Sequence, residues 1–112
     1  MNDIPPRSTD LSADIRRLQN RIEELGRIGA ITGGGVCRLA LSDEDHESRD
    51  LIVRWMSDLD LSIQVDRIGN VIGTRAGMLD SPPVMIGSHI DSVATGGLYD
   101  GALGVLAGLE AI

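Results

Sequence analysis

The sequence contains no lysine and no phenylalanine, and it has one cysteine and two aromatic residues in 112 positions. The single Cys37 cannot form a disulfide within the chain, which favours the reducing cytoplasm as its compartment. No apolar run reaches the roughly 20 residues that a membrane-spanning helix needs. The first ten residues also lack the apolar core of a secretory signal. With so few aromatic rings, a core must be built from Leu, Ile, Val and Ala.

All ten basic residues are arginine, and 17 acidic residues give a net charge of −7. An acidic chain with no dense basic run is a poor candidate for binding nucleic acid or an anionic membrane, so we expect neither as a partner. The length suits one domain. A hydrophobic content of 42% and a mean hydropathy of +0.04 are typical of a globular chain.

The N-terminal third predicts a short leader followed by a helix. Residues 1–9 contain Pro5 and Pro6 and are predicted to be a flexible leader, and 10–112 are predicted to fold. From Asp10, apolar residues recur at three- and four-residue steps, as on one face of a helix. These residues are Leu11, Ile15, Leu18, Ile22 and Leu25.

A second helix is predicted to begin at Ser42, with Asp45 as its capping-box partner. Its expected buried face consists of apolar residues at helical spacing: Leu51, Ile52, Trp55, Met56 and Leu59. Between the helices, Gly33–Gly35 predicts a loop rather than a phosphate-binding motif, because no strand precedes it and no Gly-Lys-Ser/Thr follows it.

The pattern then changes to that of strands. Residues 61–65 alternate apolar and polar, and 71–74 follow a Gly-Asn turn signal as a hairpin partner. The apolar run 84–88 predicts a strand buried on both faces. A last helix is predicted over 101–112 with no stop signal, and its Val105, Leu109 and Ile112 are expected to lie uncovered. The order of elements favours a layered α/β architecture.

One histidine and two aspartates lie in the Gly-rich stretch after the run 84–88. His89 follows that predicted strand directly, at the end where open α/β sheets bind ligands. If the chain stays extended, the Asp91 carboxylate can accept one imidazole N–H and leave the other ring nitrogen for a metal. Asp100 precedes the last helix, where a carboxylate can bridge two metal ions about 3.5–4 Å apart.

The same residue types are common in structural roles. A single histidine after a strand is usually a hydrogen-bonded polar group, and an aspartate at a helix start is usually a cap. Spacing alone does not decide between these roles and a metal site.

The segment from Pro83 to Ile112, with GSHIDS and GGLYDGALGV, strongly resembles the hydantoinase/carbamoylase branch of the M20 family of metallo-amidohydrolases and metallopeptidases. The resemblance extends to Gly33–Asp45 and Val65–Gly77 and covers most of the chain from Leu18. It implies that 10–112 form the N-terminal part of a layered α/β, metallo-exopeptidase-like catalytic domain, truncated and without the family's lid and dimerisation domain.

The resemblance also implies a site. If the motif residues have the same roles as in this family, His89 is a metal ligand and Asp91 orients its ring. Asp100 then bridges two divalent ions. Zinc or manganese is expected, with cobalt or nickel as alternatives. The family's Glu-Glu pair and two further histidine ligands have no counterpart after Asp100.

The implied reaction is hydrolysis of a non-peptide C–N bond in a linear amide or amidine, with an N-carbamoyl amino acid or other ureido acid as the small-molecule substrate. Allantoate hydrolysis and M20 peptidase activity are the alternatives within the family. A truncated, non-catalytic fragment and a small binding module are alternatives from other classes. A longer form is expected to be a homodimer, whereas the 112-residue chain alone is expected to be inactive.

Other chemically capable residues are interpreted as structural. Arg38 could face an anionic substrate, but a buried pairing is at least as good an interpretation. Cys37 is interpreted as a small core residue and Asn70 as a turn residue. His46 and the pair Glu23-Glu24 are expected on solvated helix faces.

Overall fold

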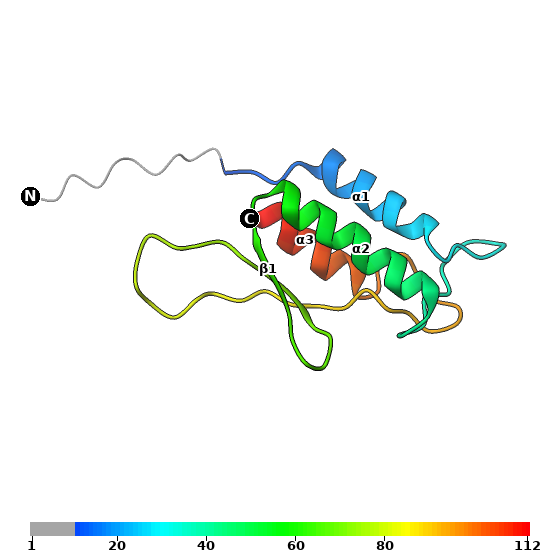
Figure 1. Cartoon of the computed structure of the whole chain (residues 1–112). Coiled ribbons are helices and arrows are strands. Elements are labelled where there is room, and N and C mark those ends of the chain that lie inside the picture. The colour runs from blue at the N-terminus through cyan, green and yellow to red at the C-terminus, as the bar shows by residue number, and fades with distance from the viewer. Residues whose placement is uncertain (1–10) are drawn as a thin grey trace, which may run out of the picture.

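The computed structural model describes residues 11–112, so the predicted leader 1–9 lies outside the described residues. Three helices run alongside one another, and a hairpin projects from one side of them (Figure 1). Among residues 11–112, no helix has both the length and the apolarity to cross a membrane. The elements, in chain order, are α1 (Ile15–Arg27), α2 (Asp43–Asp58), β1 (Ser62–Val65), β2 (Val71–Thr74) and α3 (Ala102–Ala111).

Helix α1 begins later than its apolar periodicity predicts. The side chain of Asp14 accepts a hydrogen bond from the backbone N–H of Arg17 at 3.0 Å, so Asp14 is the N-cap. Leu11 consequently lies before the helix and is 93% exposed, and Ile15 in the first turn is 65% exposed. The predicted start at Asp10 is therefore wrong, whereas Ile22 and Leu25 are buried as expected.

Helix α2 begins where the sequence predicts. The Ser42 hydroxyl accepts the Asp45 backbone N–H at 3.2 Å. The Asp45 carboxylate accepts the N–H of Leu41 at 2.9 Å, one residue before the position that a capping box uses. The Asp45 N–H, one of the orphan donors of this helix start, and the N–H of Leu41 just before it are thereby satisfied. Of the predicted face, Leu51 and Ile52 are buried, and the remaining three residues pack against the core while partly exposed.

The predicted hairpin is confirmed, with β1 and β2 antiparallel and Val65 opposite Val71. Asp66 organises its turn, because Oδ1 accepts the backbone N–H groups of Ile68, Gly69 and Asn70. Asn70 also donates from its side-chain amide to Asp66 Oδ2 at 2.7 Å, which confirms it as a turn residue. These hydrogen bonds, the side-chain one first, lower the pKa of the Asp66 carboxyl.

Helix α3 is not left uncovered, contrary to expectation. It packs against α1, and its buried Leu106 and Leu109 belong to the same core cluster as Leu51 and Ile52 of α2. Val105 is partly buried, and only Ile112 of the predicted face is exposed, at 39%. All three helices and the residue before β1 contribute to one core, whose buried members are Ile22, Leu25, Leu51, Ile52, Leu61, Ala102, Leu106 and Leu109.

The predicted buried strand over 84–88 is wrong for the described structure. These residues have no strand conformation, and Val84, Met85 and Ile86 are 96%, 76% and 59% exposed. A strand needs a neighbour to satisfy its backbone groups, and the described residues contain only β1 and β2, which pair with each other. The fold is therefore a mixed α/β arrangement whose sheet has two strands rather than the expected three.

Arg38 is the most deeply buried charged residue of the described chain, at 2% exposure. Its Nη1 donates to the carbonyls of Leu25 and Ile28, both at 3.0 Å, and its Nε donates to the carbonyl of Ile90 at 2.7 Å. Burial lowers the pKa of the guanidinium, and the nearby Asp45 and Asp91 partly oppose that shift. Arg38 thus joins the end of α1 to the segment that contains His89, as a structural residue rather than one that faces a substrate.

We expect Arg38→Met to lower the free energy of unfolding by about 3 kcal/mol, because it leaves the part-buried carbonyls of Ile28 and Ile90 without this donor and the Leu25 carbonyl with only the Ile28 N–H. Arg38→Lys should cost less, since an ammonium can still donate to some of the three carbonyls. Urea unfolding followed by circular dichroism measures both. The matched control is Arg16→Met, because Arg16 is exposed on α1. Equal stability of the Arg38→Met and Arg16→Met variants would contradict this role.

Helices α1 and α3 are joined by a second, exposed arginine. Arg17 donates to the Glu110 carboxylate from Nε at 2.8 Å and from Nη2 at 2.6 Å, and the Asp14 N–H adds a third bond at 2.7 Å. The Arg17 hydrogen bond is the largest of the causes that lower the pKa of Glu110 from 4.5 to about 2. The carboxylate therefore stabilises the fold fully above pH 4.5 and progressively less as the pH falls toward 2.

Glu110→Gln should accordingly make stability less sensitive to acid between those two pH values, since the neutral amide cannot gain a proton. Thermal unfolding at a series of pH values tests this, with the exposed Glu47→Gln on α2 as the control. A loss of melting temperature on acidification that is the same in Glu110→Gln and in the parent chain would refute it.

Candidate metal centre

The segment around His89 is fixed by hydrogen bonds to the segment around Arg38. The Ser92 backbone N–H donates to the Arg38 carbonyl at 2.7 Å, and the Arg38 N–H donates to Ser92 Oγ at 2.8 Å. The Ile90 carbonyl accepts from the Arg38 guanidinium. His89 and Asp91 therefore flank a residue whose backbone is held in place by a buried charge.

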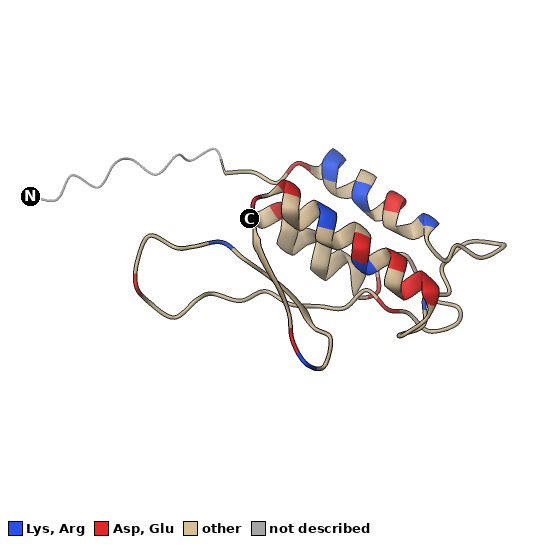
Figure 2. Ribbon diagram, viewed as in Figure 1, with Lys and Arg blue, Asp and Glu red and all other residues tan. Residues whose placement is uncertain are grey.

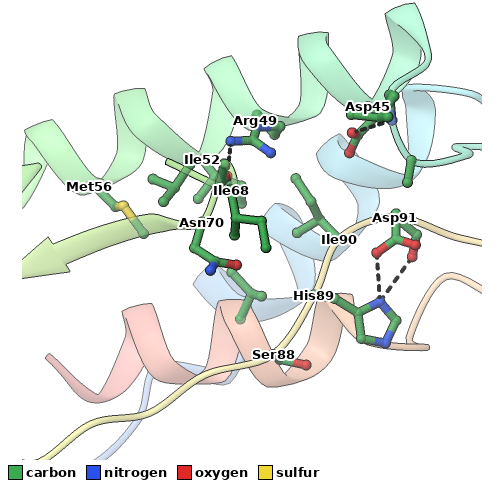
Figure 3. Close-up of a pocket in the computed structure, with 15 residues that line it drawn as sticks. Asp45, Arg49, Ile52, Met56, Ile68, Asn70, Ser88, His89, Ile90 and Asp91 are labelled. Atoms are coloured by element: carbon green, nitrogen blue, oxygen red, sulfur yellow. Dashed lines mark hydrogen bonds and ion pairs between the residues drawn. The ribbon is translucent and has the colours of Figure 1, made fainter. Parts of the chain in front are cut away.

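His89 and Asp91 face each other, as expected from the sequence (Figure 3). His89 Nδ1 lies 3.1 Å from the Asp91 backbone carbonyl and 3.3 Å from its carboxylate Oδ1. Both atoms are acceptors, so together they favour the tautomer with the proton on Nδ1. Nε2 is then left with an unshared pair of electrons.

Asp100 lies on the Nε2 side of the ring. Its Oδ1 is 3.9 Å from His89 Nε2, although eleven residues separate the two in sequence. The side chains of His89, Asp91 and Asp100 are 52%, 45% and 66% exposed, so the site is open to solvent. The structure thus brings together all three residues that the sequence singles out.

The donor atoms fit a divalent cation. His89 Nε2 and Asp100 Oδ1 are 3.9 Å apart. A metal–nitrogen bond and a metal–oxygen bond of about 2.0–2.2 Å each are together slightly longer than this distance. One ion can therefore contact both atoms after a small adjustment of the side chains. An imidazole nitrogen and a carboxylate oxygen suit zinc or manganese. Within residues 11–112, however, no group of three or more His, Cys, Asp or Glu side chains is arranged to hold a metal.

A cavity of about 310 Å³ opens beside His89 and Asp91. Arg49 on α2 and Ile68 and Asn70 at the hairpin turn line its other side (Figure 3). Arg49 donates to the Gly69 carbonyl and so holds the hairpin turn against α2. The cavity can accept a small molecule next to the candidate ligands.

Of the residues predicted to be structural, Asn70 lines the cavity, whereas His46, Glu23, Glu24 and Cys37 do not. His46 has 80% of its side chain exposed, and Glu23 and Glu24 are exposed on α1, as expected. Cys37 is only partly buried rather than a core residue. Sequence reasoning missed Ser92, which is 8% exposed and holds the Arg38 backbone, because a serine after a short motif carries no distinguishing signal.

Known proteins that are similar to this chain identify its family. An N-carbamoyl-L-amino-acid amidohydrolase of Pseudomonas sp. is 52% identical over 97 residues, which are 86% of this chain and 23% of the relative. A solved hydantoinase/carbamoylase family amidase of Burkholderia vietnamiensis is 50% identical with a TM-score of 0.88, over 91% of this chain and 25% of its own. The chain belongs to the hydantoinase/carbamoylase amidohydrolase family. It spans about a quarter of the length of these relatives.

Two further relatives show the breadth of this family. An allantoate amidohydrolase of Bacillus subtilis is 41% identical over 92 residues, covering 81% of this chain and 22% of the relative. A solved structure of AtUAH in complex with glyoxylate is 35% identical with a TM-score of 0.83, over 88% of this chain and 24% of its own. No family model matches the sequence.

The two histidines of the chain provide a matched test of metal binding. We expect the 112-residue chain to bind Mn²⁺ or Zn²⁺ weakly, since catalytic zinc usually has about three protein ligands, and His89→Ala to weaken that binding at least about tenfold. His46→Ala is the control, because His46 also has a carboxylate near Nδ1, that of Asp50 at 3.5 Å. Calorimetric titration measures both. Equal effects of the two substitutions would show that His89 is not a specific ligand.

Proposed function

We propose that this chain provides part of the metal site of an enzyme that hydrolyses the carbamoyl C–N bond of N-carbamoyl amino acids. The observation that supports it most is the position of the His89 ring, with Asp91 at Nδ1 and Asp100 on the side of Nε2. A histidine oriented by a carboxylate, with a second carboxylate beside its free nitrogen, is a suitable donor pair for a divalent ion.

Each residue has a separate role in this proposal. Bound divalent ions would polarise the substrate carbonyl and lower the pKa of a bound water. His89 would hold an ion through Nε2, and Asp91 keeps the proton on Nδ1 and fixes the ring's orientation. Asp100 has two carboxylate oxygens, which would allow it to contact two ions. Arg38 holds the Ile90 carbonyl and so maintains the spacing of the two residues on either side.

The substrate assignment rests on the relatives. The Pseudomonas relative is named for N-carbamoyl-L-amino acids, and it is 52% identical to this chain. Hydrolysis of allantoate is the second candidate, favoured by the relative from Bacillus subtilis at 41% identity. Cytoplasmic location and dimer formation by a longer form are parts of the same proposal.

A chimaeric enzyme tests the proposal directly. The 97 matched residues of the Pseudomonas relative are replaced by the corresponding residues of this chain, and release of ammonia from N-carbamoyl amino acids and from allantoate is measured with Mn²⁺ or Zn²⁺. We expect the chimaera to hydrolyse N-carbamoyl amino acids preferentially. Preference for allantoate would support the second candidate. A folded, metal-loaded chimaera without either activity would overturn the proposal.

In that chimaera, Asp91→Asn should reduce the rate by about 10–100-fold while changing metal content much less, because the amide keeps the shape but loses the charge that orients the imidazole. The control is Asp80→Asn, which lies in an exposed loop outside the site. Metal analysis and kcat from the same samples separate the two effects. A parental rate in Asp91→Asn would remove Asp91 from the mechanism.

A further inference from the structure

Gly101 has an unusual backbone conformation between Asp100 and α3. Its φ of 70° and ψ of −47° are those of the strained form of the γ-turn, which residues with a side chain rarely adopt. The Ala102 N–H donates to the Asp100 carbonyl at 2.8 Å, which closes the three-residue turn. The direction in which the Asp100 side chain leaves the backbone therefore depends on a turn that favours glycine.

The same glycine leaves the space that the His89 ring occupies. A Cβ at position 101 would lie 2.5 Å from His89 Nδ1 and 2.5 Å from the His89 backbone oxygen, closer than real Cβ atoms approach. Both a ring atom and a backbone atom would have to move, so rotation of the histidine side chain alone would not relieve the contact. Conformation and space thus both require glycine here.

A hydrogen bond from Ser88 links this turn to the segment that contains His89. Its hydroxyl donates to the Gly101 carbonyl at 2.8 Å. One helical turn further along, a Cβ at Gly104 would lie 2.7 Å from Ser88 Oγ, so this helix position also has to be small. The close approach of 88–89 to the start of α3 depends on these contacts, and it is what brings His89 Nε2 to 3.9 Å from Asp100 Oδ1.

We propose that Gly101 is a positioning residue of the metal site. Its γ-turn, fastened by Ser88, sets the separation between His89 Nε2 and the Asp100 carboxylate. The proposal rests on the proposed function, because this separation matters for chemistry only if the two side chains share a cation.

Two other glycines allow strain and contact to be separated. Gly33 also has a positive φ, of 92°, but a Cβ there would meet nothing within 4 Å. Gly97 has no such φ and equally open surroundings. Gly33→Ala therefore reports the cost of the backbone conformation away from the site, and Gly97→Ala reports an alanine substitution in the loop before Asp100.

The experiment compares the three alanine variants and Ser88→Ala in the 112-residue chain. The readouts are the dissociation constants of Mn²⁺ and Zn²⁺, the melting temperature, and the NOE between the His89 ring Hε1 and the Gly101 Hα protons in the parent chain. We expect Gly101→Ala to weaken metal binding at least about tenfold and Ser88→Ala to weaken it by a smaller factor. Gly33→Ala and Gly97→Ala should leave the metal dissociation constant unchanged, although Gly33→Ala lowers the melting temperature.

The outcomes separate this proposal from the proposed function. Parental metal affinity in a folded Gly101→Ala variant would overturn the positioning role. If Gly101→Ala does not fold, Ser88→Ala decides, and parental affinity in that variant overturns it equally. If the parent chain binds neither Mn²⁺ nor Zn²⁺, the metal assignment fails, whereas the NOE still tests the position of the ring. Absence of that NOE from the folded parent chain would contradict the geometry.

Discussion

Arg38 donates hydrogen bonds from a buried guanidinium to the carbonyls of Leu25, Ile28 and Ile90. Two of these carbonyls belong to Leu25, near the end of α1, and to Ile28 directly after it, and the third lies between His89 and Asp91. The Ile28 carbonyl lies beyond the helix and has no helical donor, whereas the Leu25 carbonyl also accepts the Ile28 N–H at 3.1 Å. Removing a charge from water is unfavourable, so it has to be compensated by complete hydrogen bonding. The structure meets this requirement by bringing together parts of the chain that are 65 residues apart, from Leu25 to Ile90.

The site follows from this constraint. Once the Ile90 carbonyl is fixed and Ser92 is paired with the Arg38 backbone, the side chains at 89 and 91 have little freedom in their relative positions. Asp91 then orients the imidazole (Figure 3), and the γ-turn at Gly101 directs Asp100 to the other side of the ring. Acidic side chains dominate the start of α2 (Figure 2). One of them, Asp45, partly offsets the buried positive charge of Arg38, and so does Asp91.

Local signals in the sequence predict those elements that are stabilised by residues close to them in the chain. Ser42 predicts the start of α2, and the Gly-Asn turn predicts the hairpin, because both depend on neighbouring backbone groups. The motif residues His89, Asp91 and Asp100 were identified from spacing and family resemblance. The apolar run 84–88 predicts a buried strand that the structure lacks, because such a strand depends on partner strands about which the local pattern gives no information. Arg38, Ser92 and Gly101 act across long sequence separations, and periodicity gives no information about such contacts.

The central claim is that Asp91 holds the proton on Nδ1 of His89 and leaves Nε2 free beside Asp100. The most direct measurement is the tautomeric state of His89 in the metal-free chain, observed through long-range ¹H–¹⁵N correlations of the imidazole ring above the pH at which the ring is charged. The account predicts the Nδ1–H tautomer for His89, and a smaller population of it in Asp91→Asn, which keeps the backbone carbonyl at 3.1 Å but loses the carboxylate charge. A dominant Nε2–H tautomer in the parent chain would contradict it.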